Sequence, residues 1–453
     1  MRHVIVTPSK RTNGSGGVGL DLGTVRSDNR VAAATGRYVV VMSDEVHGDH
    51  AAVADALRSM AGVTSIASTR DFEASALDVG QASTADATVF AELGIAVVAA
   101  DPDQQASITA AADRDRHILA IEPERILYAV NDPTPLSVHC LHSYRDAGTE
   151  LDEQATGGSG ETALQAAPRF ADTPGFTWGL QATMVFTSSH TGEGVPVAVL
   201  DTGFDFGHPD FTGRDITAQS FVPDELPQDG HGHGTHCVGT SCGPATPSGT
   251  RRYGVANQSN IFVGKVLSDQ GSGTDTTILA GMSWALANGC RVISMSLGAN
   301  IRTVSQAYDA VGRRALNAGT LIVAAAGNNA RRRADDLGFV GVPANSPSIM
   351  AVAAVDSALH IADFSARSAP VAGGQVDIAG PGVAVYSSWP MPDRYRTISG
   401  TSMATPHVAG IAALWSEATG ATGAALWSAV VQAASRLPLP SVDVGAGLAQ
   451  APQ

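Results

Sequence analysis

Five short, almost uninterrupted apolar segments between residue 173 and the C-terminus constrain the fold of this chain most strongly. They read VPVAVLDTG, NIFVGKVL, RVISMSLG, TLIVAAAGN and IMAVAAVD, and segments with a helical pattern, such as TDTTILAGMSWALANG, separate several of them. A strand that is buried on both faces of a sheet reads as a continuous apolar run, and helices between such strands form crossover connections. The pattern therefore predicts an α/β fold, with a doubly wound parallel sheet that helices cover on both faces.

A smaller pattern of strands and helices precedes this region. We expect strands at residues 37–43, 63–69, 95–100 and 117–130, and helices at residues 49–62 and 101–114. Asp49 is the expected N-cap of the first helix, because its short carboxylate can accept hydrogen bonds from the first turn. The order βαββαβ predicts a small ferredoxin-like α+β domain.

Two segments lack the periodicity of either region. Residues 1–36 are rich in Gly, Ser and Asn, and residues 131–172 are rich in Pro, Gly and polar residues. Such composition is typical of loops and linkers. We therefore divide the chain into a flexible tail (1–36), the small α+β domain (37–130), a linker (131–172) and the α/β domain (173–453).

The composition argues against several classes of protein. The chain has 453 residues, with 28 Lys plus Arg against 43 Asp plus Glu and a formal net charge of −15, whereas nucleic-acid-binding proteins usually present a basic surface. No apolar run reaches the ~18 residues of a membrane helix, and four cysteines are too few for a disulfide scaffold. We expect a monomer that binds neither nucleic acid nor a membrane.

The N-terminal sequence MRHVIVTPSKRTNGSGG contains basic residues but no sustained apolar core, so it is not typical of a secretory signal. We therefore expect a protein that acts in the cytoplasm or leaves the cell by a non-Sec route. The expected location is extracellular if the natural start of the protein differs from Met1.

Ser402, within GTSMATPHVAG, raises the first chemical question, because a serine before a helix is either a helix cap or a nucleophile. A nucleophilic serine requires a base, a carboxylate that orients the base, and donors for the oxyanion. Asp201 ends the apolar segment VPVAVLD, His233 lies in DGHGHGTHCVGT, and Asn328 ends VAAAGN. Active sites of open α/β sheets lie at the carboxyl ends of the strands, so the pattern favours a common site there.

Each of these residues alone also has another interpretation. Asp201 is typical of a turn after a strand, and His233 with His236 has the HxxH spacing of half a zinc site. The glutamate of the HExxH motif is missing, which argues against zinc. Asp, His and Ser in this order, each in a long matching context on an α/β pattern, favour a catalytic triad.

VAVLDTGFDFGHPDF, GHGTHCVGT and GTSMATPHVAG resemble the three active-site segments of the subtilisin-like serine proteases, or subtilases. The resemblance extends from about Trp178 to residue 452. It implies that Asp201 orients the base, that His233 is the base and that Ser402 is the nucleophile. Asn328 and the backbone N–H of Ser402 are the implied oxyanion donors, and the chemistry needs no cofactor.

The same resemblance implies a cleft in which polypeptide substrates add a β-strand to the enzyme. The residues that it assigns to the backbone contacts and to the walls of the S1 and S4 subsites are Gly271, Ser272, Gly273, Asp275, Ser296, Leu297, Gly298, Ala326 and Gly327. Asp275 is assigned to the S4 wall, where many relatives have a bulkier or aromatic residue.

Residues 37–130 are similar in their βαββαβ order to the inhibitory propeptide of the family. This similarity implies a zymogen, in which the N-terminal domain assists folding and acts as an intramolecular inhibitor. Its last strand is then expected to lead EPERILYAV, residues 122–130, through the cleft, where the enzyme cuts it in cis.

The residue before the cleaved bond, P1, is generally apolar or aromatic in this family. Tyr128 is therefore the predicted P1 residue of the self-cleavage, and Val130 is the alternative. With Tyr128 at P1, Leu127 is P2 and Arg125 is P4. We predict that Arg125 then forms an ion pair with Asp275, unless the two are unrelated surface charges.

Two positions concern metals and thiols. Asp210 matches a usual calcium ligand of the family, which makes it a candidate for a structural calcium site, but the ligand loop of relatives is replaced by SCGPATPSGTRRYG. Cys237 lies four residues after His233 on an expected helix, so both side chains share one face. Relatives with a cysteine here are called thiol-dependent, and a buried small apolar residue is the alternative interpretation.

The sequence thus predicts a serine endopeptidase that is made as a self-processing zymogen. One alternative is a maturation protease dedicated to a single partner protein. The other is an inert binding module, against which the presence of Asp201, His233, Ser402 and Asn328 argues.

Overall fold

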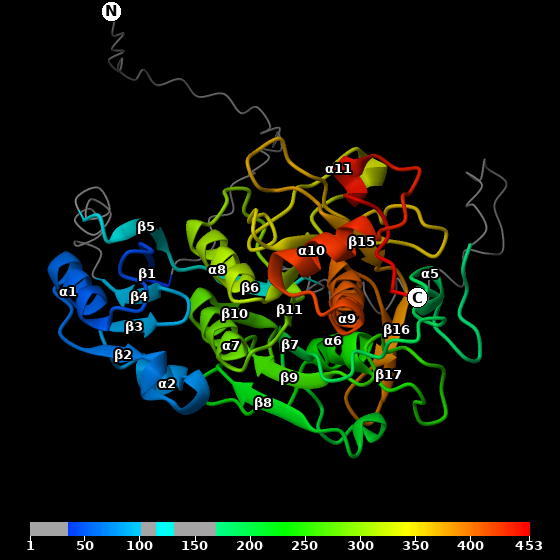
Figure 1. Cartoon of the computed structure of the whole chain (residues 1–453), viewed down its shortest axis with the longest axis horizontal. Coiled ribbons are helices and arrows are strands. Elements are labelled where there is room, and N and C mark those ends of the chain that lie inside the picture. Colours follow the sequence, from blue (N-terminus) through cyan, green and yellow to red (C-terminus); the bar gives the residue numbers. More distant parts are fainter. Residues whose placement is uncertain (1–34, 101–114, 131–168) are drawn as a thin grey trace, which may run out of the picture. The chain divides into compact units, whose positions relative to one another are not determined.

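The computed structural model describes residues 35–100, 115–130 and 169–453, and a seven-stranded sheet lies at its centre (Figure 1). The strand order is β15-β14-β13-β11-β7-β9-β8, and every neighbouring pair is parallel. The strands are β7 (Pro196–Asp201), β8 (Ile216–Ser220), β9 (Asn260–Lys265), β11 (Val292–Met295), β13 (Leu321–Ala325), β14 (Met350–Val355) and β15 (Ile378–Pro381). The predicted α/β fold with a parallel sheet is confirmed.

Helices pack against both faces of this sheet (Figure 1). Strand β7 shows the reason for its continuous apolar sequence, because Val197 and Val199 belong to one buried cluster while Ala198 and Leu200 belong to another. The first cluster contains residues of α6 (His233–Cys242) and α9 (Thr401–Thr419), and the second contains residues of α7 (Asp275–Ala287) and α8 (Gln306–Asn317). The remaining elements of this region are α5 (Trp178–Ala182), β10 (Ser272–Thr274), β12 (Leu297–Gly298), β16 (Val385–Ser388), β17 (Tyr395–Ile398), α10 (Gly423–Gln432) and α11 (Ser441–Val444).

The segment predicted as the N-terminal domain, residues 37–130, contains a second sheet of five strands in the order β2-β3-β4-β1-β5. Its elements are β1 (Arg37–Met42), α1 (His50–Ala61), β2 (Ile66–Ser68), α2 (Val79–Ala82), β3 (Ala87–Phe90), β4 (Ile95–Ala99) and β5 (Ile118–Pro123). The carboxylate of Asp49 caps α1 as predicted, accepting from the N–H groups of its first turn. The helix predicted at residues 101–114 lies outside the described residues.

Two expectations for this domain are corrected. Strand β3 was not predicted, because its sequence ATVF is only four residues long, too short for a pattern that identifies a strand. The strand predicted at residues 63–69 is reduced to three residues of β2, at the edge of the sheet and parallel to β3.

The strand predicted at residues 117–130 divides into two strands that belong to different sheets. Strand β5 ends at Pro123. The next strand, β6 (Ile126–Ala129), is not part of the five-stranded sheet and pairs antiparallel with both β10 and β12. The resulting three-stranded sheet has the order β10-β6-β12. Residues 126–129 are thus held between two strands of the α/β domain, which is the geometry of β-strand addition.

Helix α7 belongs to the cores of both domains. Eleven of its 13 residues are buried, and Ile278 and Met282 share one apolar cluster with Phe90 and Ile95 of the N-terminal domain. A helix that is apolar on all sides needs cover on both sides, and here the parallel sheet and the N-terminal domain provide it. Within the described ranges there is no helix with both the length and the apolar composition needed to cross a lipid bilayer.

Charged groups reinforce this contact between the domains. Glu122 accepts from the N–H of Gln306 at 2.6 Å, and Glu124 accepts from the N–H of Thr276 at 3.0 Å, so each carboxylate lies at the N-terminal turn of α8 or α7. Free N–H groups and the helix dipole favour a negative charge there. In the opposite direction, Arg314 of α8 donates to three backbone carbonyls of the N-terminal domain, at 2.5, 2.7 and 3.3 Å.

Candidate active site

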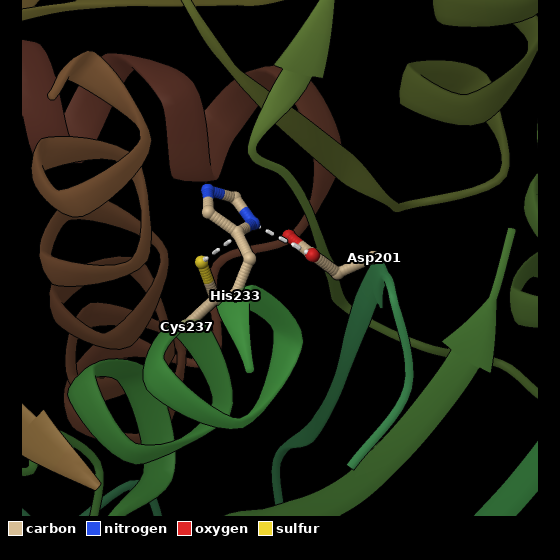
Figure 2. Close-up of side chains that lie close together, drawn as sticks. All are labelled: Asp201, His233 and Cys237. Carbon is tan, nitrogen blue, oxygen red and sulfur yellow. Dashed lines mark hydrogen bonds and ion pairs between the residues drawn. The ribbon is translucent and has the colours of Figure 1, made fainter. Parts of the chain in front are cut away.

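Asp201 and His233 form a buried hydrogen-bonded pair (Figure 2). Asp201 is the last residue of β7 and His233 is the first residue of α6; each is 1% exposed, and 2.7 Å separates Oδ1 of Asp201 from Nδ1 of His233. Gly234 permits this approach, because a Cβ atom at this position would lie 2.2 Å from the carbonyl oxygen of Gly203. Any side chain at residue 234 would therefore push α6 away from the loop that follows Asp201.

A second carboxylate, Asp229, fixes the loop that leads into α6. Its Oδ1 accepts from the hydroxyl of Thr202 at 2.9 Å and from the N–H of Gly232 at 2.8 Å, while Oδ2 accepts from the N–H of Thr235 at 2.8 Å. Thr202 follows Asp201 and Gly232 precedes His233 in the sequence. Asp229 therefore holds the neighbours of both residues of the Asp201–His233 pair close together.

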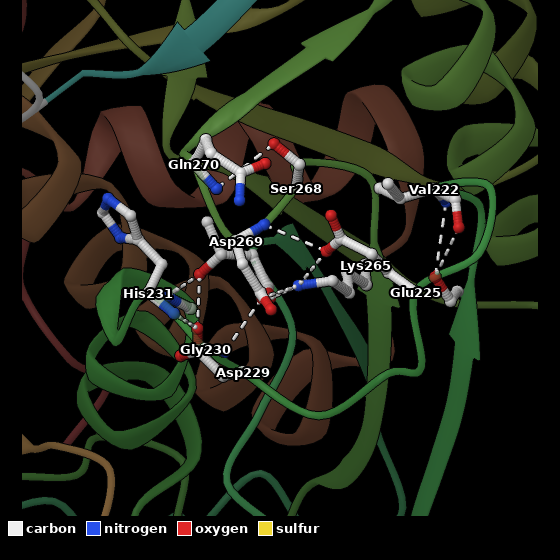
Figure 3. Close-up of polar contacts among 12 residues, drawn as sticks. Val222, Glu225, Asp229, Gly230, His231, Lys265, Ser268, Asp269 and Gln270 are labelled. Carbon is white, nitrogen blue, oxygen red and sulfur yellow. Dashed lines mark hydrogen bonds and ion pairs between the residues drawn. The ribbon is translucent and has the colours of Figure 1, made fainter.

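Lys265, at the end of β9, forms polar contacts with loops of the same region (Figure 3). Its ammonium group is fully buried and donates to the carbonyl of Thr202 and to the carboxylate of Asp269, both at 2.6 Å, with Glu225 at 3.2 Å. Asp269 in turn accepts from the N–H of Gly230 at 2.9 Å. A buried ammonium requires such partners, and here they connect three loops around the Asp201–His233 pair.

Ser402 is the second residue of α9, so its N–H has no carbonyl four residues earlier within the helix. Its hydroxyl donates to the carbonyl of Ser296 at 3.0 Å. Nε2 of His233 is buried and has no hydrogen-bond partner among the described residues. The structure therefore joins Asp201 to His233 directly, whereas the Ser402 hydroxyl is bonded to the carbonyl of Ser296 and not to Nε2 of His233.

Asn328, three residues beyond β13, has a fixed amide orientation. Its Oδ1 accepts from the N–H of Thr401 at 3.0 Å and from the hydroxyl of Thr401 at 2.9 Å. The nitrogen must then point the other way, and Nδ2 donates to the carbonyl oxygen of Val130 at 2.6 Å. Asn328 thus presents a donor to a backbone carbonyl of the strand that occupies the cleft.

Strand β6 fills the predicted cleft in extended form. The N–H of Ala129 donates to the carbonyl of Gly271 at 2.9 Å, and the N–H of Val130 donates to the carbonyl of Ser296 at 3.3 Å. The paired residues of the ladder are Ser272 with Tyr128, Gly273 with Leu127, Leu297 with Ala129, and Gly298 with Tyr128. All six residues predicted from Gly271–Gly273 and Ser296–Gly298 therefore line this strand.

Ala326 and Gly327 follow β13 and lie near the same region of the fold. The N–H of Gly327 donates to the hydroxyl of Thr401 at 3.2 Å, and Ala326 is fully buried. Their role as a wall of the S1 subsite stays a prediction.

The predicted register of the tail is corrected by two residues. The carbonyl oxygen that meets Asn328 belongs to Val130 and not to Tyr128, so the structure favours the alternative P1 residue. The reason is that Tyr128 is held by its ladder partners Ser272 and Gly298, well inside the paired strand. In this register Leu127 becomes P4, and its side chain is fully buried in the apolar cluster.

The predicted ion pair between Arg125 and Asp275 is also corrected. The guanidinium group of Arg125 donates to Glu122 at 2.9 Å, whereas the carboxylate of Asp275 accepts from the backbone N–H of Arg125 at 2.8 Å. Burial raises the pKa of Asp275 to about 6, against the opposing charge of Arg125. The two residues do meet, but through the main chain of Arg125.

Asp210 does not fit a calcium site. Both of its carboxylate oxygens are engaged by donors: Oδ2 accepts from the hydroxyls of Tyr253 at 2.7 Å and Tyr395 at 3.0 Å, and Oδ1 accepts from the N–H of Ser248 at 2.8 Å. Calcium prefers six to eight oxygen ligands that donate electron pairs, whereas these neighbours direct their hydrogens at the carboxylate. Tyrosine hydroxyls thus satisfy Asp210 without a metal.

Cys237 lies beside the histidine, as predicted from the helical spacing. Its Sγ is 3.9 Å from Nδ1 of His233 (Figure 2). The same sulfur is 3.6 Å from the carbonyl oxygen of Ser402. Burial, and next the charge of Asp201, raises the pKa of the Cys237 thiol well above its ordinary value. A protonated, fully buried thiol is not a nucleophile, so Cys237 packs against the pair as a small apolar residue.

His236 has a different hydrogen-bond partner from His233 despite the HxxH spacing. Its Nε2 donates to the carbonyl of Val385 at 3.0 Å, and burial lowers the pKa of His236 to about 3, so the ring is neutral. With Nδ1 of His233 engaged by Asp201, the two histidines serve different partners, which agrees with the argument against a zinc site.

Comparison with known proteins identifies relatives of the α/β domain. Residues 192–447 match the subtilase family. Over 237 residues, 52% of this chain, the sequence is 42% identical to subtilisin from Bacillus pumilus and 41% identical to subtilisin E from Bacillus subtilis (strain 168). The match covers 81% of the first protein and 58% of the second. Thermitase from Thermoactinomyces vulgaris is 39% identical over 224 residues, which are 49% of this chain and 75% of thermitase.

These similarities agree with the parallel sheet and with the geometry at the carboxyl ends of its strands. The matched region contains Asp201, His233, Asn328 and Ser402. The chain therefore belongs to the subtilase family and is a subtilisin-like serine endopeptidase.

Proposed function

We propose that the protein is a self-processing endopeptidase in which Ser402 is the nucleophile, His233 the general base and Asp201 the residue that orients His233. Asn328 and the N–H of Ser402 supply the oxyanion hole. The N-terminal domain acts as an intramolecular inhibitor, and its strand β6 is the first substrate of the cleft.

One contact carries this proposal: Nδ2 of Asn328 donates to the carbonyl oxygen of Val130 at 2.6 Å. An oxyanion hole needs a donor at about this distance from the carbonyl oxygen, because this oxygen becomes negative when the carbonyl carbon is attacked. The carbonyl belongs to a strand that pairs with both sides of the cleft, as an extended substrate does. The bond that follows Val130 is therefore the proposed cleavage site.

The chemistry proceeds in two halves. The Ser402 hydroxyl turns from the carbonyl of Ser296 to Nε2 of His233, which accepts its proton as Oγ attacks the carbonyl carbon. Asp201, bonded to Nδ1, stabilises the imidazolium that forms. His233 then protonates the leaving amine, and a water molecule repeats the sequence on the acyl-enzyme with Ser402 as leaving group.

The inhibitory role of the N-terminal domain is supported by the contacts between this domain and helices α7 and α8. Helix α7 shares an apolar cluster with it, and Glu122 and Glu124 neutralise the N-terminal turns of α8 and α7. These contacts survive cleavage of the bond after Val130, since none of them depends on that bond. The cut domain is thus expected to remain in the cleft until it unfolds or is digested.

Incubation of the purified chain is expected to cut it after Val130, giving a new chain that begins at Asn131. The physical reason is the register of β6, which aligns the Val130 carbonyl with Asn328. Intact-mass measurement and N-terminal sequencing of the larger product measure the site. The Ser402→Ala variant, prepared in parallel, is expected to remain uncut.

Variants within the tail check the register independently. Val130→Asp is expected to slow self-cleavage, because it brings a carboxylate to an apolar subsite, whereas Tyr128→Ala should still be cut after residue 130. A new chain that begins at Ala129 would contradict the proposed register and restore Tyr128 as P1.

A mercurial is expected to abolish the peptidase activity through Cys237. Asp201, His233 and Cys237 place their ligand atoms within 4.8 Å of one another, and mercury(II) binds sulfur strongly enough to displace the proton of the Cys237 thiol. Because Sγ of Cys237 is 3.9 Å from Nδ1 of His233, a metal bound to this sulfur would compete with Asp201 for that nitrogen. The measurement is residual activity after titration with the mercurial.

Cys237→Ala is expected to be resistant to the same concentration. Cys242→Ala is the matched control, since Cys242 lies on the same helix and is also fully buried but is five residues further along. This control should stay sensitive. Equal inhibition of the Cys237→Ala variant would show that another thiol is responsible.

A further inference from the structure

Asp275 pairs with both backbone groups of a single residue in the bound strand. Its own N–H donates to the carbonyl oxygen of Arg125 at 3.0 Å, and its carboxylate Oδ2 accepts from the N–H of Arg125 at 2.8 Å. This two-point contact directly continues the ladder in which Thr274 is paired with Ile126. The pairing between the strand and the cleft thus extends one residue beyond the end of β10.

The carboxylate replaces a backbone acceptor that the ladder lacks at this point. In a regular antiparallel pair, the N–H of Arg125 would bond to the carbonyl of Asp275. Asp275 is instead the first residue of α7, where the carbonyl accepts from within the helix. Oδ2 of Asp275 therefore accepts the hydrogen bond from Arg125 that the backbone carbonyl of Asp275 does not accept.

A hydrogen bond from α8 fixes the position of the Asp275 carboxylate. Its second oxygen, Oδ1, accepts from the hydroxyl of Tyr308 on α8 at 2.8 Å. Asp275 is 2% exposed and Tyr308 is 1% exposed. A buried carboxylate is costly unless its oxygens are hydrogen-bonded, and with the strand in place both oxygens of Asp275 have donors.

The contact does not depend on the arginine side chain. The guanidinium group of Arg125 turns to Glu122 at 2.9 Å, on its own strand–turn segment. Any residue other than proline offers the same N–H to Asp275. Asp275 therefore recognises the backbone of an extended segment and not a particular side chain. It does so at a fixed number of residues from the reacting carbonyl.

With Val130 at P1, Arg125 is the sixth residue before the cleaved bond. We propose that Asp275 forms a main-chain subsite, S6, which binds the backbone N–H of the P6 residue and makes the enzyme selective for extended segments of at least six residues before the scissile bond. This inference rests on the proposed function, because it takes its register from the contact between Val130 and Asn328. It also implies that proline at P6 is disfavoured.

The test uses two peptides and the self-processed enzyme after the cut N-terminal domain has been digested. Both peptides have the sequence acetyl-Ala-Ile-Leu-Tyr-Ala-Val before a fluorogenic leaving group, and in the second an ester oxygen replaces the N–H of the P6 residue. The first is expected to have a kcat/KM roughly 10- to 100-fold higher, because a hydrogen bond to a charged acceptor is lost in the second. The main change should be in KM, since the P6 residue is remote from the reacting bond.

Variants at residue 275 assign the effect. In Asp275→Leu the ratio of the two kcat/KM values is expected to fall to about 1, and Asp275→Asn, which keeps an acceptor oxygen, should retain part of the discrimination. The ratio is independent of how much of each variant is folded. Equal kcat/KM values for the two peptides with the unaltered enzyme, or an undiminished ratio in Asp275→Leu, would overturn the proposal.

A third peptide separates this inference from the function on which it rests. Acetyl-Leu-Tyr-Ala-Val before the same leaving group ends at P4 and cannot reach Asp275. If the unaltered enzyme cuts this peptide but does not distinguish the first two, the S6 subsite is wrong and the endopeptidase stands. If it cuts none of the three, the proposed function and the subsite both fail.

Discussion

Replacement of Ser402 by alanine is expected to lower kcat for peptide hydrolysis by about 10⁶-fold, the size known for the nucleophile of subtilisin, to which this chain is similar. The change removes the atom that forms the acyl-enzyme, while the Asp201–His233 pair and the Asn328 amide remain in place. Steady-state hydrolysis of a fluorogenic peptide measures the loss. Casein hydrolysis under the same conditions distinguishes a general endopeptidase from one dedicated to a single partner.

We do not expect the Ser402→Ala variant to lose its activity through misfolding. The hydroxyl makes one hydrogen bond, to the carbonyl of Ser296, and such a bond contributes about 1 kcal/mol to stability. A fluorophosphonate probe should label the unaltered enzyme and not this variant. Ser428→Ala is the matched control, because Ser428 is an exposed serine of α10, and it should be labelled normally. Full activity of Ser402→Ala would contradict the proposed nucleophile.

Replacement of Asn328 by alanine is expected to lower kcat by roughly 10²–10³-fold with little change in KM; the magnitude is carried over from the oxyanion asparagine of subtilisin. The donor at 2.6 Å from the Val130 carbonyl gains strength as that oxygen becomes negative, so its removal acts mainly on the transition state. Separate determination of kcat and KM with one peptide substrate is the measurement.

Asn328→Asp separates the donor from the other contacts of this residue. Aspartate keeps an oxygen for the N–H and hydroxyl of Thr401 but offers no N–H to the oxyanion. The kcat of this variant should fall at least as far as that of Asn328→Ala, because a carboxylate also repels the developing negative charge. A raised KM with an intact kcat in both variants would show that Asn328 binds substrate but does not stabilise the oxyanion.

Much of the architecture could be predicted from local sequence. The continuous apolar runs of β7, β9, β11, β13 and β14 identified the parallel sheet, because a strand covered on both faces has no polar side. The strand-end position of Asp201 and the glycine-rich context of His233 followed from the same reading. These features concern neighbours in sequence or a repeated pattern, and short-range rules describe them well.

The register of the tail could not be predicted in this way. ILYAV offers apolar residues at every position, so neither Tyr128 nor Val130 stands out as the residue before the cleaved bond. The tertiary structure decides the register of β6, because this strand pairs with β10 and β12 at the same time. A shift of one residue would reverse which side chains face the cleft.

By itself, the sequence determined the class of fold, and it pointed to Asp201, His233 and Ser402 as the candidate triad. Tertiary structure alone decided which partners satisfy the carboxylates of Asp210 and Asp275. The hydroxyls of Tyr253 and Tyr395 reach Asp210 from 43 and 185 residues away, and the N–H of Arg125 reaches Asp275 from 150 residues away. A carboxylate accepts from any donor that the fold brings within about 3 Å, and no local pattern records which donor that will be.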